Sequence, residues 1–268
     1  MSDHLLRAHA PITDDGWQRI DEEAQGRLRP GLAARRLVDF EGPLGWQYSA
    51  TNLGRVEPVD AGGLGDVEAR RRRVLPLVEL RAPFRVSREE LRAGDRGAED
   101  VDFDDLDEAA QRMVVAENTA VFHGWDAAGV AGIAPSSPHD AITCGEEIDR
   151  YPSHVARAVE LLLRSGVSGP YGLALGREEY TRVIEAAEHG GYPLLDHLRK
   201  ILDGPIVWAP GVNGGVAVSM RGGDFLLESG QDLSVGYDAH DADAVSLYLE
   251  ESFSFRIASP EAAVAIVP

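Results

Sequence analysis

The sequence predicts a mixed α+β fold, with helices through most of the chain and strands concentrated toward its end. Apolar residues recur at helical spacing over residues 13–28 and, most regularly, over 103–122. Short apolar segments bounded by glycine and proline fill residues 205–257, which is typical of strands and turns. Residues 48–73 contain several glycines and few large apolar side chains, so this segment cannot pack a core by itself.

Composition and charge exclude several classes of protein. The 268 residues include 45 acidic and 26 basic side chains, a formal net charge of −19, which argues against nucleic acid as the main partner. No apolar run reaches the roughly 18 residues that cross a bilayer, and the first residues do not have the pattern of a signal peptide. Cys144 is the sole cysteine, which fits a reducing compartment. We therefore expect a cytoplasmic protein of one large or two modest domains.

The first expected helix covers residues 13–28, and Thr13 or Asp14 can cap its amino end. A Pro-Gly pair follows it and ends it. The apolar face of this helix consists of Trp17, Ile20, Ala24 and Leu28. A short second helix is expected over 32–38, with a turn at 41–46 after it.

The segment at 48–73 is expected to be a long loop or β-hairpin that leaves the body; a disordered insertion is the alternative. The next apolar run, over 74–86, predicts a strand that is buried on both faces for part of its length. The strongest helix of the chain is then expected over 103–122, with Asp102 or Asp104 as its cap.

The second half of the chain predicts helices first and strands afterwards. A loop is expected at 129–138, and a short buried strand within 169–176. Helices are expected over 153–164, 177–188 and 194–202. Strands are expected over 205–210, 216–219, 225–228, 233–237 and 244–257.

Motifs that carry catalytic chemistry are absent from the sequence. It contains no Gly-x-Ser-x-Gly, no Gly-x-Gly-x-x-Gly, no Walker A loop and no helical histidine pair for zinc. The acidic run at 99–108 does not have EF-hand spacing, so a solvated helix start is favoured over a calcium site. Residues 238–243 are interpreted as a hairpin turn rather than a metal site, and Cys144 as a buried structural cysteine rather than part of a thiol dyad. Missing motifs weigh against an enzyme without excluding one, because catalytic triads are set by geometry and not by spacing. We predict no catalytic residue and no metal site, and enzymatic activity is not expected.

Short blocks spread over nearly the whole chain resemble, in the same order, the encapsulin (linocin-type) shell proteins of family 1. The opening resembles the family's pattern of leucine and arginine, Ala-Pro and tryptophan at Leu6–Arg7, Ala10–Pro11 and Trp17. The later blocks are RRLVD at 35–39, EGPLGW at 41–46, LPLVELR at 75–81, FHG at 122–124, GPY at 169–171, YPL at 192–194, RGGDF at 221–225 and GQDLSVGY at 230–237.

The resemblance implies the HK97-like fold of phage capsid proteins, with a peripheral domain, an axial domain and an extended loop. It assigns residues 1–47 to the peripheral domain with the amino-terminal helix, 48–73 to the extended loop, 74–131 to the peripheral domain with the spine helix, 132–222 to the axial domain and 223–268 to a return into the peripheral domain.

The implied function is a self-assembling icosahedral shell in the cytoplasm, a homo-oligomer of about 60 chains. Such a shell encloses a cargo enzyme, a dye-decolourising peroxidase or a ferritin-like protein, with roles in oxidative stress or iron storage. The cargo is bound through its carboxyl-terminal targeting peptide, and pores admit small molecules or ions. We expect part of the acidic surplus to line pores and to attract cations.

The resemblance also assigns site residues. Cargo-peptide binding is expected at Arg35, Asp39, Leu233 and Tyr237. The alternative is a helical ion pair between Arg35 and Asp39, with the other two residues in the core. A five-fold pore is expected at Glu188, His189, Gly190, Gly191 and Tyr192; a plain helix end that requires the same glycines is the alternative.

Some relatives carry a flavin on an aromatic side chain after the LPL strand. The matching residues 85–90 contain no aromatic residue, so no flavin and no other cofactor is predicted. Two alternatives to a cargo shell remain from the sequence: a phage-type major capsid protein that holds DNA, and a soluble hydrolase. Neither membrane nor nucleic acid is an expected partner.

Overall fold

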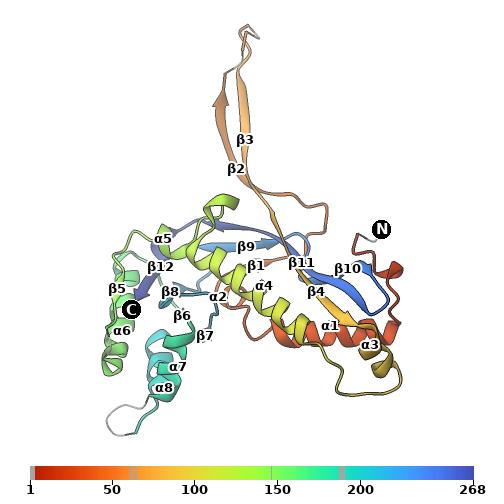
Figure 1. The fold of residues 1–268 in the computed structure, drawn as a ribbon. Coiled ribbons are helices and arrows are strands. Elements are labelled where there is room, and N and C mark those ends of the chain that lie inside the picture. Colours follow the sequence, from red (N-terminus) through yellow and green to blue (C-terminus); the bar gives the residue numbers. More distant parts are fainter. Residues whose placement is uncertain (1–3, 61, 64, 146, 187–190) are drawn as a thin grey trace.

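A computed structural model of the chain describes residues 4–60, 62–63, 65–145, 147–186 and 191–268. It contains two five-stranded sheets and a two-stranded hairpin that extends far beyond both (Figure 1). The α+β class expected from the sequence is confirmed, and each sheet has helices packed against it.

The first sheet is built around the long strand β11 (Ala244–Ile257). It has the order β1-β9-β11-β10, with β4 also paired to β11. The other strands are β1 (Asp39–Glu41), β4 (Val78–Ser87), β9 (Phe225–Ser229) and β10 (Ser234–His240). The helices at this sheet are α1 (Asp14–Leu28), α3 (Arg88–Asp95) and the first part of α4 (Asp104–His123).

Helix α1 begins and packs as its sequence predicts. The Thr13 hydroxyl accepts a hydrogen bond from the Gly16 amide at 3.0 Å, and two aspartates stand in the first turn, where the helix dipole favours negative charge. Its predicted apolar face is buried against α4 and β10. The buried residues of that face are Trp17, Ile20, Ala24 and Leu28.

Helix α4 connects two hydrophobic cores. Its first part contributes Leu106 and Met113 to the core under the first sheet, whereas Phe122 near its end lies in the larger core, which includes the second sheet and the adjoining parts of β9 and β11. The Asp102 side chain accepts a hydrogen bond from the Asp104 amide at the start of the helix. Gly124 ends it with φ +88°, and a Cβ atom there would lie 2.8 Å from the Gly132 amide nitrogen.

The second sheet has the order β5-β12-β8-β6-β7. Its strands are β5 (Ile142–Thr143), β6 (Tyr171–Leu175), β7 (Ile206–Trp208), β8 (Gly215–Ser219) and β12 (Ala263–Val267). All residues of β6 and β8 are buried, as expected for central strands covered on both faces. The helices of this region are α5 (Ile133–Ser136), α6 (Tyr151–Arg164), α7 (Arg177–Glu185) and α8 (Leu194–Leu202).

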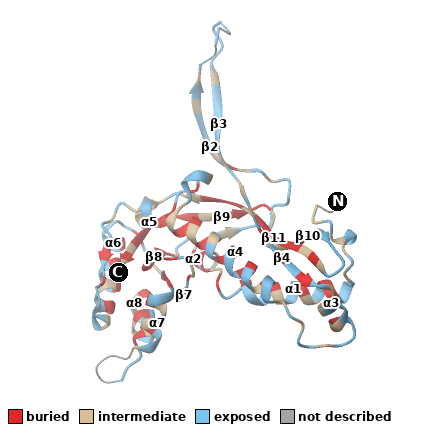
Figure 2. Ribbon diagram, viewed as in Figure 1, coloured by how far each residue is buried: buried red, intermediate tan, exposed pale blue. Residues whose placement is uncertain are grey.

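The segment expected to leave the body is a β-hairpin of strands β2 (Ala50–Val59) and β3 (Ala69–Pro76). Figures 1 and 2 show it extending away from both sheets, with most of its surface exposed. A short helix α2 (Ala34–Leu37) follows α1, and four single-turn 3₁₀ segments complete the described elements: Arg7–His9, Asp126–Ala128, Ile148–Arg150 and Pro260–Ala262.

Several expected elements differ from the structure. The single strand at 74–86 is divided at Leu77, and β4 alternates between buried and exposed side chains instead of being buried on both faces. Helix α3 lies between the expected strand at 74–86 and the expected helix at 103–122, where no element was expected, and α5 lies inside the expected loop at 129–138. The chain does not end in the first sheet, because β12 pairs with β8 and β5 in the second. The expected division into peripheral and axial domains, with 223–268 returning to the peripheral domain, stays a prediction.

Candidate functional site

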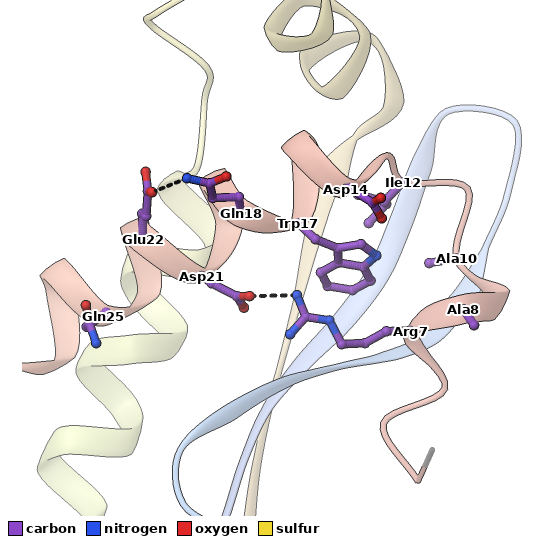
Figure 3. Close-up of a pocket in the computed structure, with 10 residues that line it drawn as sticks. All are labelled: Arg7, Ala8, Ala10, Ile12, Asp14, Trp17, Gln18, Asp21, Glu22 and Gln25. Carbon is purple, nitrogen blue, oxygen red and sulfur yellow. Dashed lines mark hydrogen bonds and ion pairs between the residues drawn. The ribbon is translucent and has the colours of Figure 1, made fainter. Parts of the chain in front are cut away.

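Two adjoining grooves lie along α1. The Trp17 groove, of about 730 Å³, lies between α1 and the amino-terminal segment (Figure 3). The Leu233 groove, of about 500 Å³, lies between α1, α2 and β10. Both grooves are lined by Arg7, Asp21 and Gln25, so they meet at these side chains.

The amino-terminal segment forms one wall of the Trp17 groove and is attached to the first sheet. The Leu5 carbonyl accepts a hydrogen bond from the Tyr237 amide of β10 at 2.8 Å. The His4 ring stacks on Trp46 at 4.7 Å between centroids. These contacts hold residues 7–12 opposite α1, where Ala8, Ala10 and Ile12 contribute apolar surface to the groove.

The Leu233 groove has an apolar floor and a charged edge. Its apolar lining consists of Ala24, Leu28, Leu32, Leu233, Val235 and Leu249. Charged side chains at its edge include Arg29, Arg35 and Asp232. A groove of this composition suits an extended peptide that places apolar side chains on the floor and polar groups at the edge.

Arg35 connects this groove to the interior through a group that we call the Arg35 cluster, made of Arg35, Glu117, Asp232 and Glu251. The guanidinium donates to Glu117 at 2.8 Å, to Asp232 at 2.5 Å and to Glu251 at 2.8 Å. Glu117 and Glu251 are fully buried, on α4 and β11. One oxygen of each has no hydrogen-bond partner among the described residues.

The cluster holds three carboxyl groups around one guanidinium, and this imbalance shifts its pKa values. Burial alone lowers the pKa of Arg35, but Glu117, Glu251 and Asp232 together raise it above its usual value. Burial, followed by repulsion from Glu117, raises the pKa of Glu251 well above that of an exposed glutamate. The Glu251 carboxyl group therefore favours its protonated form more than an exposed glutamate does.

Helix α2, which carries Arg35, is fixed to α4 by Asn118. The buried amide oxygen of Asn118 accepts from the backbone amides of Ala33 and Ala34, at 3.1 and 3.3 Å. Its amide nitrogen donates to the carbonyls of Gly31 and Pro210, at 2.8 and 3.0 Å. One side chain thus orients the start of α2 and joins it to a loop of the second sheet.

The structure brings together two of the four residues expected at the peptide site. Arg35 and Leu233 line the Leu233 groove. Asp39 stands in β1 and accepts a hydrogen bond from the Gly223 amide at 2.6 Å. The Tyr237 hydroxyl contacts His240 at 2.6 Å, and its body packs against the first-sheet core. No ion pair joins Arg35 to Asp39 within the described residues, so the alternative of a helical pair receives no support.

Sequence reasoning missed most of the residues that line the grooves. Trp17 was expected only as core, and Asp21, Gln25 and Arg29 fall on the polar side of the same helix. An arginine in the amino-terminal segment, Arg7, reaches α1 across a turn. The signal that was available is the resemblance block around residues 5–17, which includes both Arg7 and Trp17.

Only part of the expected pore segment can be described. Glu188, His189 and Gly190 lie outside the described residues. Gly191 has φ +80°, a conformation that favours glycine, and no described atom lies within 4 Å of the position of a Cβ there. The Tyr192 ring is partly exposed and lies 4.9 Å from the Lys200 ammonium group.

The described residues contain no group of side chains arranged to hold a metal ion. Residues 238–240 are the end of β10, and the turn to β11 follows at 241–243, where the Asp241 carboxylate accepts from the amides of Asp243 and Ala244. The hairpin turn is therefore shorter than the expected 238–243. Cys144 is buried, and burial raises the pKa of its thiol to about 11, which disfavours the nucleophilic thiolate. Within the described ranges, no helix has the length and apolar character needed to span a bilayer.

Comparison with known proteins relates both the sequence and the fold to shell-forming proteins. Residues 2–254 match the Linocin_M18 family, described as encapsulating protein for peroxidase. The type 1 encapsulin shell protein of Rhodospirillum rubrum is 47% identical over 97% of this chain and 95% of its own. The corresponding protein of Mycobacterium tuberculosis is 39% identical over 98% of both chains.

Solved structures with a similar fold include a virus-like particle and a phage structure. The virus-like particle of Pyrococcus furiosus has a TM-score of 0.63 at 19% identity, covering 92% of this chain and 98% of its own. The Mycobacterium phage Bobi structure has a TM-score of 0.56 at 13% identity, covering 89% of this chain and 90% of its own. At these identities the likeness extends to the fold alone, which is the HK97-like capsid fold expected from the sequence.

Proposed function

The chain belongs to the encapsulin family of shell proteins, and on that premise we propose that about 60 copies close into an icosahedral shell around a peroxidase cargo. A shell protein acts by assembly and by selective contact rather than by catalysis. We infer a peroxidase as the cargo because the matched family is described as encapsulating protein for peroxidase. A ferritin-like iron oxidase is the alternative cargo.

The β2–β3 hairpin is the observation that carries the assembly proposal. Its backbone pairs only within itself along most of its length, and a two-stranded hairpin alone is marginally stable in water. Apolar side chains on it are left in solvent: Val56, Val67 and Val74 are 54%, 59% and 45% exposed. Contacts from neighbouring copies of the chain would cover these side chains and pair the exposed edges.

The root of the hairpin is built to hold a fixed direction. The buried Thr51 hydroxyl contacts Glu228 of β9 and Ser254 of β11. Leu77, where the chain passes from β3 to β4, donates its amide to the Ser49 carbonyl at 3.0 Å. A projecting element with a fixed root can reach a defined place on a neighbour, which closed symmetry requires.

The Leu233 groove is our candidate for the cargo-peptide site. An extended targeting peptide would place apolar side chains against Leu233 and the rest of the floor and would meet Arg35 at the edge. We assign Asp39 and Tyr237 a positioning role, because Asp39 follows α2 in the chain and Tyr237 binds the backbone of the amino-terminal segment. An Arg35→Glu shell that still loads cargo would contradict this assignment.

We also propose a five-fold pore around residues 188–192 that admits small molecules and cations. The support is the family resemblance together with the formal charge of −19 per chain, about −1,100 for 60 copies. We place the assembled shell in the cytoplasm, because a sole, buried cysteine needs no oxidising compartment.

Size-exclusion chromatography followed by negative-stain microscopy of the purified chain tests the proposal. Uniform hollow particles that hold a copurifying protein and show no nucleic acid absorbance are the expected result. Particles filled with nucleic acid would favour the phage-type capsid instead. A small, soluble oligomer with hydrolase activity would contradict the shell.

A further inference from the structure

Arg7 occupies a place in the Trp17 groove that is suited to a cation from another molecule. Its guanidinium carbon lies 4.0 Å from the centre of the Trp17 ring, and Nη2 lies 2.7 Å from Asp21 Oδ2. An aromatic face and a carboxylate on the same cation are a common way to bind arginine or lysine. Figure 3 shows Arg7 reaching from the amino-terminal segment to α1 between these two groups.

The charges of the groove exceed what Arg7 can neutralise. Asp14, Asp21 and Glu22 line it, and Arg7 is its only basic lining residue among those described. The Glu22 carboxylate accepts a hydrogen bond from the neutral Gln18 side chain at 2.8 Å, which leaves its charge uncompensated. The groove is therefore complementary to a positively charged ligand.

Arg7 is also placed so that it can be displaced. Its side chain is 27% exposed and that of Asp21 is 47% exposed, so their ion pair is in contact with solvent and weak. Arg7 stands on a single-turn 3₁₀ segment, after Leu6 in the left-handed conformation with φ +51°. Because Arg7 lines both grooves, moving it would join them into one longer channel along α1.

We propose that Arg7 is a placeholder in a cation subsite formed by Trp17 and Asp21, and that a lysine or arginine of the cargo peptide displaces it. This inference rests on the proposed peptide site in the Leu233 groove, which it extends into the Trp17 groove. The peptide would bind its apolar residues in the Leu233 groove and its cationic residue in the Trp17 groove. Arg7 then competes with the cargo and raises the selectivity for peptides that carry a positive charge at the right distance.

The test uses whole shells that are co-expressed with a fluorescent protein. The fluorescent protein carries the carboxyl-terminal segment of the protein that copurifies with the shells, either unchanged or with every lysine and arginine replaced by glutamine. Loading is measured as fluorescence per assembled shell. The shell variants are Arg7→Ala, Arg7→Lys as the conservative change, Asp21→Asn, and Asp15→Asn as a matched loss of one carboxylate on α1 outside both grooves.

We expect the unchanged tail to load better than the neutral tail in wild-type and Asp15→Asn shells. Arg7→Ala should raise the loading of the unchanged tail by about three- to tenfold, because it removes an exposed ion pair and a cation–π contact that compete with it. Arg7→Lys should behave as wild type. Asp21→Asn should remove the difference in loading between the unchanged tail and the neutral tail.

An unchanged ratio between the two tails in all variants would overturn the cation subsite, and so would a copurifying cargo whose tail carries no lysine or arginine. Leu233→Asp shells test the peptide site separately, with Leu32→Asp as a second variant if the first fails to assemble. Normal loading in the variant that assembles would contradict the proposed peptide site itself. Lost loading there, together with an unchanged ratio of the two tails, would contradict only the role of Arg7.

Discussion

Replacing Arg35 with methionine removes the one cation of the Arg35 cluster. The guanidinium makes ion pairs with Glu117, Asp232 and Glu251 at distances of 2.5 to 2.8 Å. Glu117 and Glu251 are fully buried and would remain without a countercharge, whereas Asp232 is 38% exposed and can be hydrated. Breaking a buried ion pair by removing one partner costs about 3–5 kcal/mol, and we expect a loss in this range near neutral pH.

The loss should grow as the pH rises. The pKa of Glu251 is raised in the folded chain, so its contribution to stability is fully present below its unfolded pKa and is lost as the pH rises through the folded value. Arg35 is the cation that favours the ionised form of Glu251, so without it the ionisation of Glu251 costs more, and Arg35→Met is least harmful in acid. Adding Glu251→Gln to Arg35→Met removes one of the two charges and should restore part of the stability, most clearly at alkaline pH.

Guanidinium unfolding followed by tryptophan fluorescence, at one chain concentration and several pH values, measures these effects. Concentration must be fixed because assembly stabilises the folded chain. A loss below about 1 kcal/mol at neutral pH would refute the reasoning, since it would place the carboxyl groups in contact with water. A loss that is independent of pH would refute it equally.

Three further predictions concern other described residues. Asn118→Asp leaves the carbonyls of Gly31 and Pro210 without a donor, so it should lower the free energy of unfolding by about 3 kcal/mol or more in the same measurement. An unchanged free energy of unfolding would show that water replaces the amide. His123 accepts a hydrogen bond from the Asn213 amide, and burial lowers the pKa of His123. Its contribution to the stability of the fold is therefore fully present above about pH 6.5 and is lost as the pH falls below the lowered pKa. His123→Gln should therefore reduce the fall in melting temperature between about pH 7.5 and about pH 5, and an unchanged fall would contradict the contact. Gly191→Val forces a β-branched residue to φ +80°, so it should change the rate at which small molecules enter the shell, while shells still form. Gly191→Asn should change the entry rate less, because asparagine tolerates this conformation. Entry rates equal to that of wild-type shells in both variants would contradict a pore at this loop.

The sequence predicted those elements whose causes are local. Helix α1 has its cap at Thr13 and its apolar face within 15 consecutive residues, and α4 repeats the same pattern over 20. The loop or hairpin that leaves the body was predicted because few large apolar residues lie between 48 and 73. In both cases the deciding information lies inside the segment itself.

Elements that depend on distant partners were predicted poorly. The run at 74–86 looks like one strand, because only the pairing of β3 with β2 and of β4 with β11 divides it at Leu77. The last strand, β12, joins the second sheet through β8, about 50 residues earlier in the chain. The Arg35 cluster joins residues that are 82 and 216 positions apart, so no local pattern could indicate it.

Hydrogen exchange over residues 50–76, compared between assembled shells and dissociated chains, tests the central claim most directly. We expect slow exchange of the hairpin amides in shells and rapid exchange in dissociated chains, while the amides of α4 stay protected in both. Equal protection of the hairpin in a folded, dissociated monomer would show that it is stable without neighbours, and it would contradict the account.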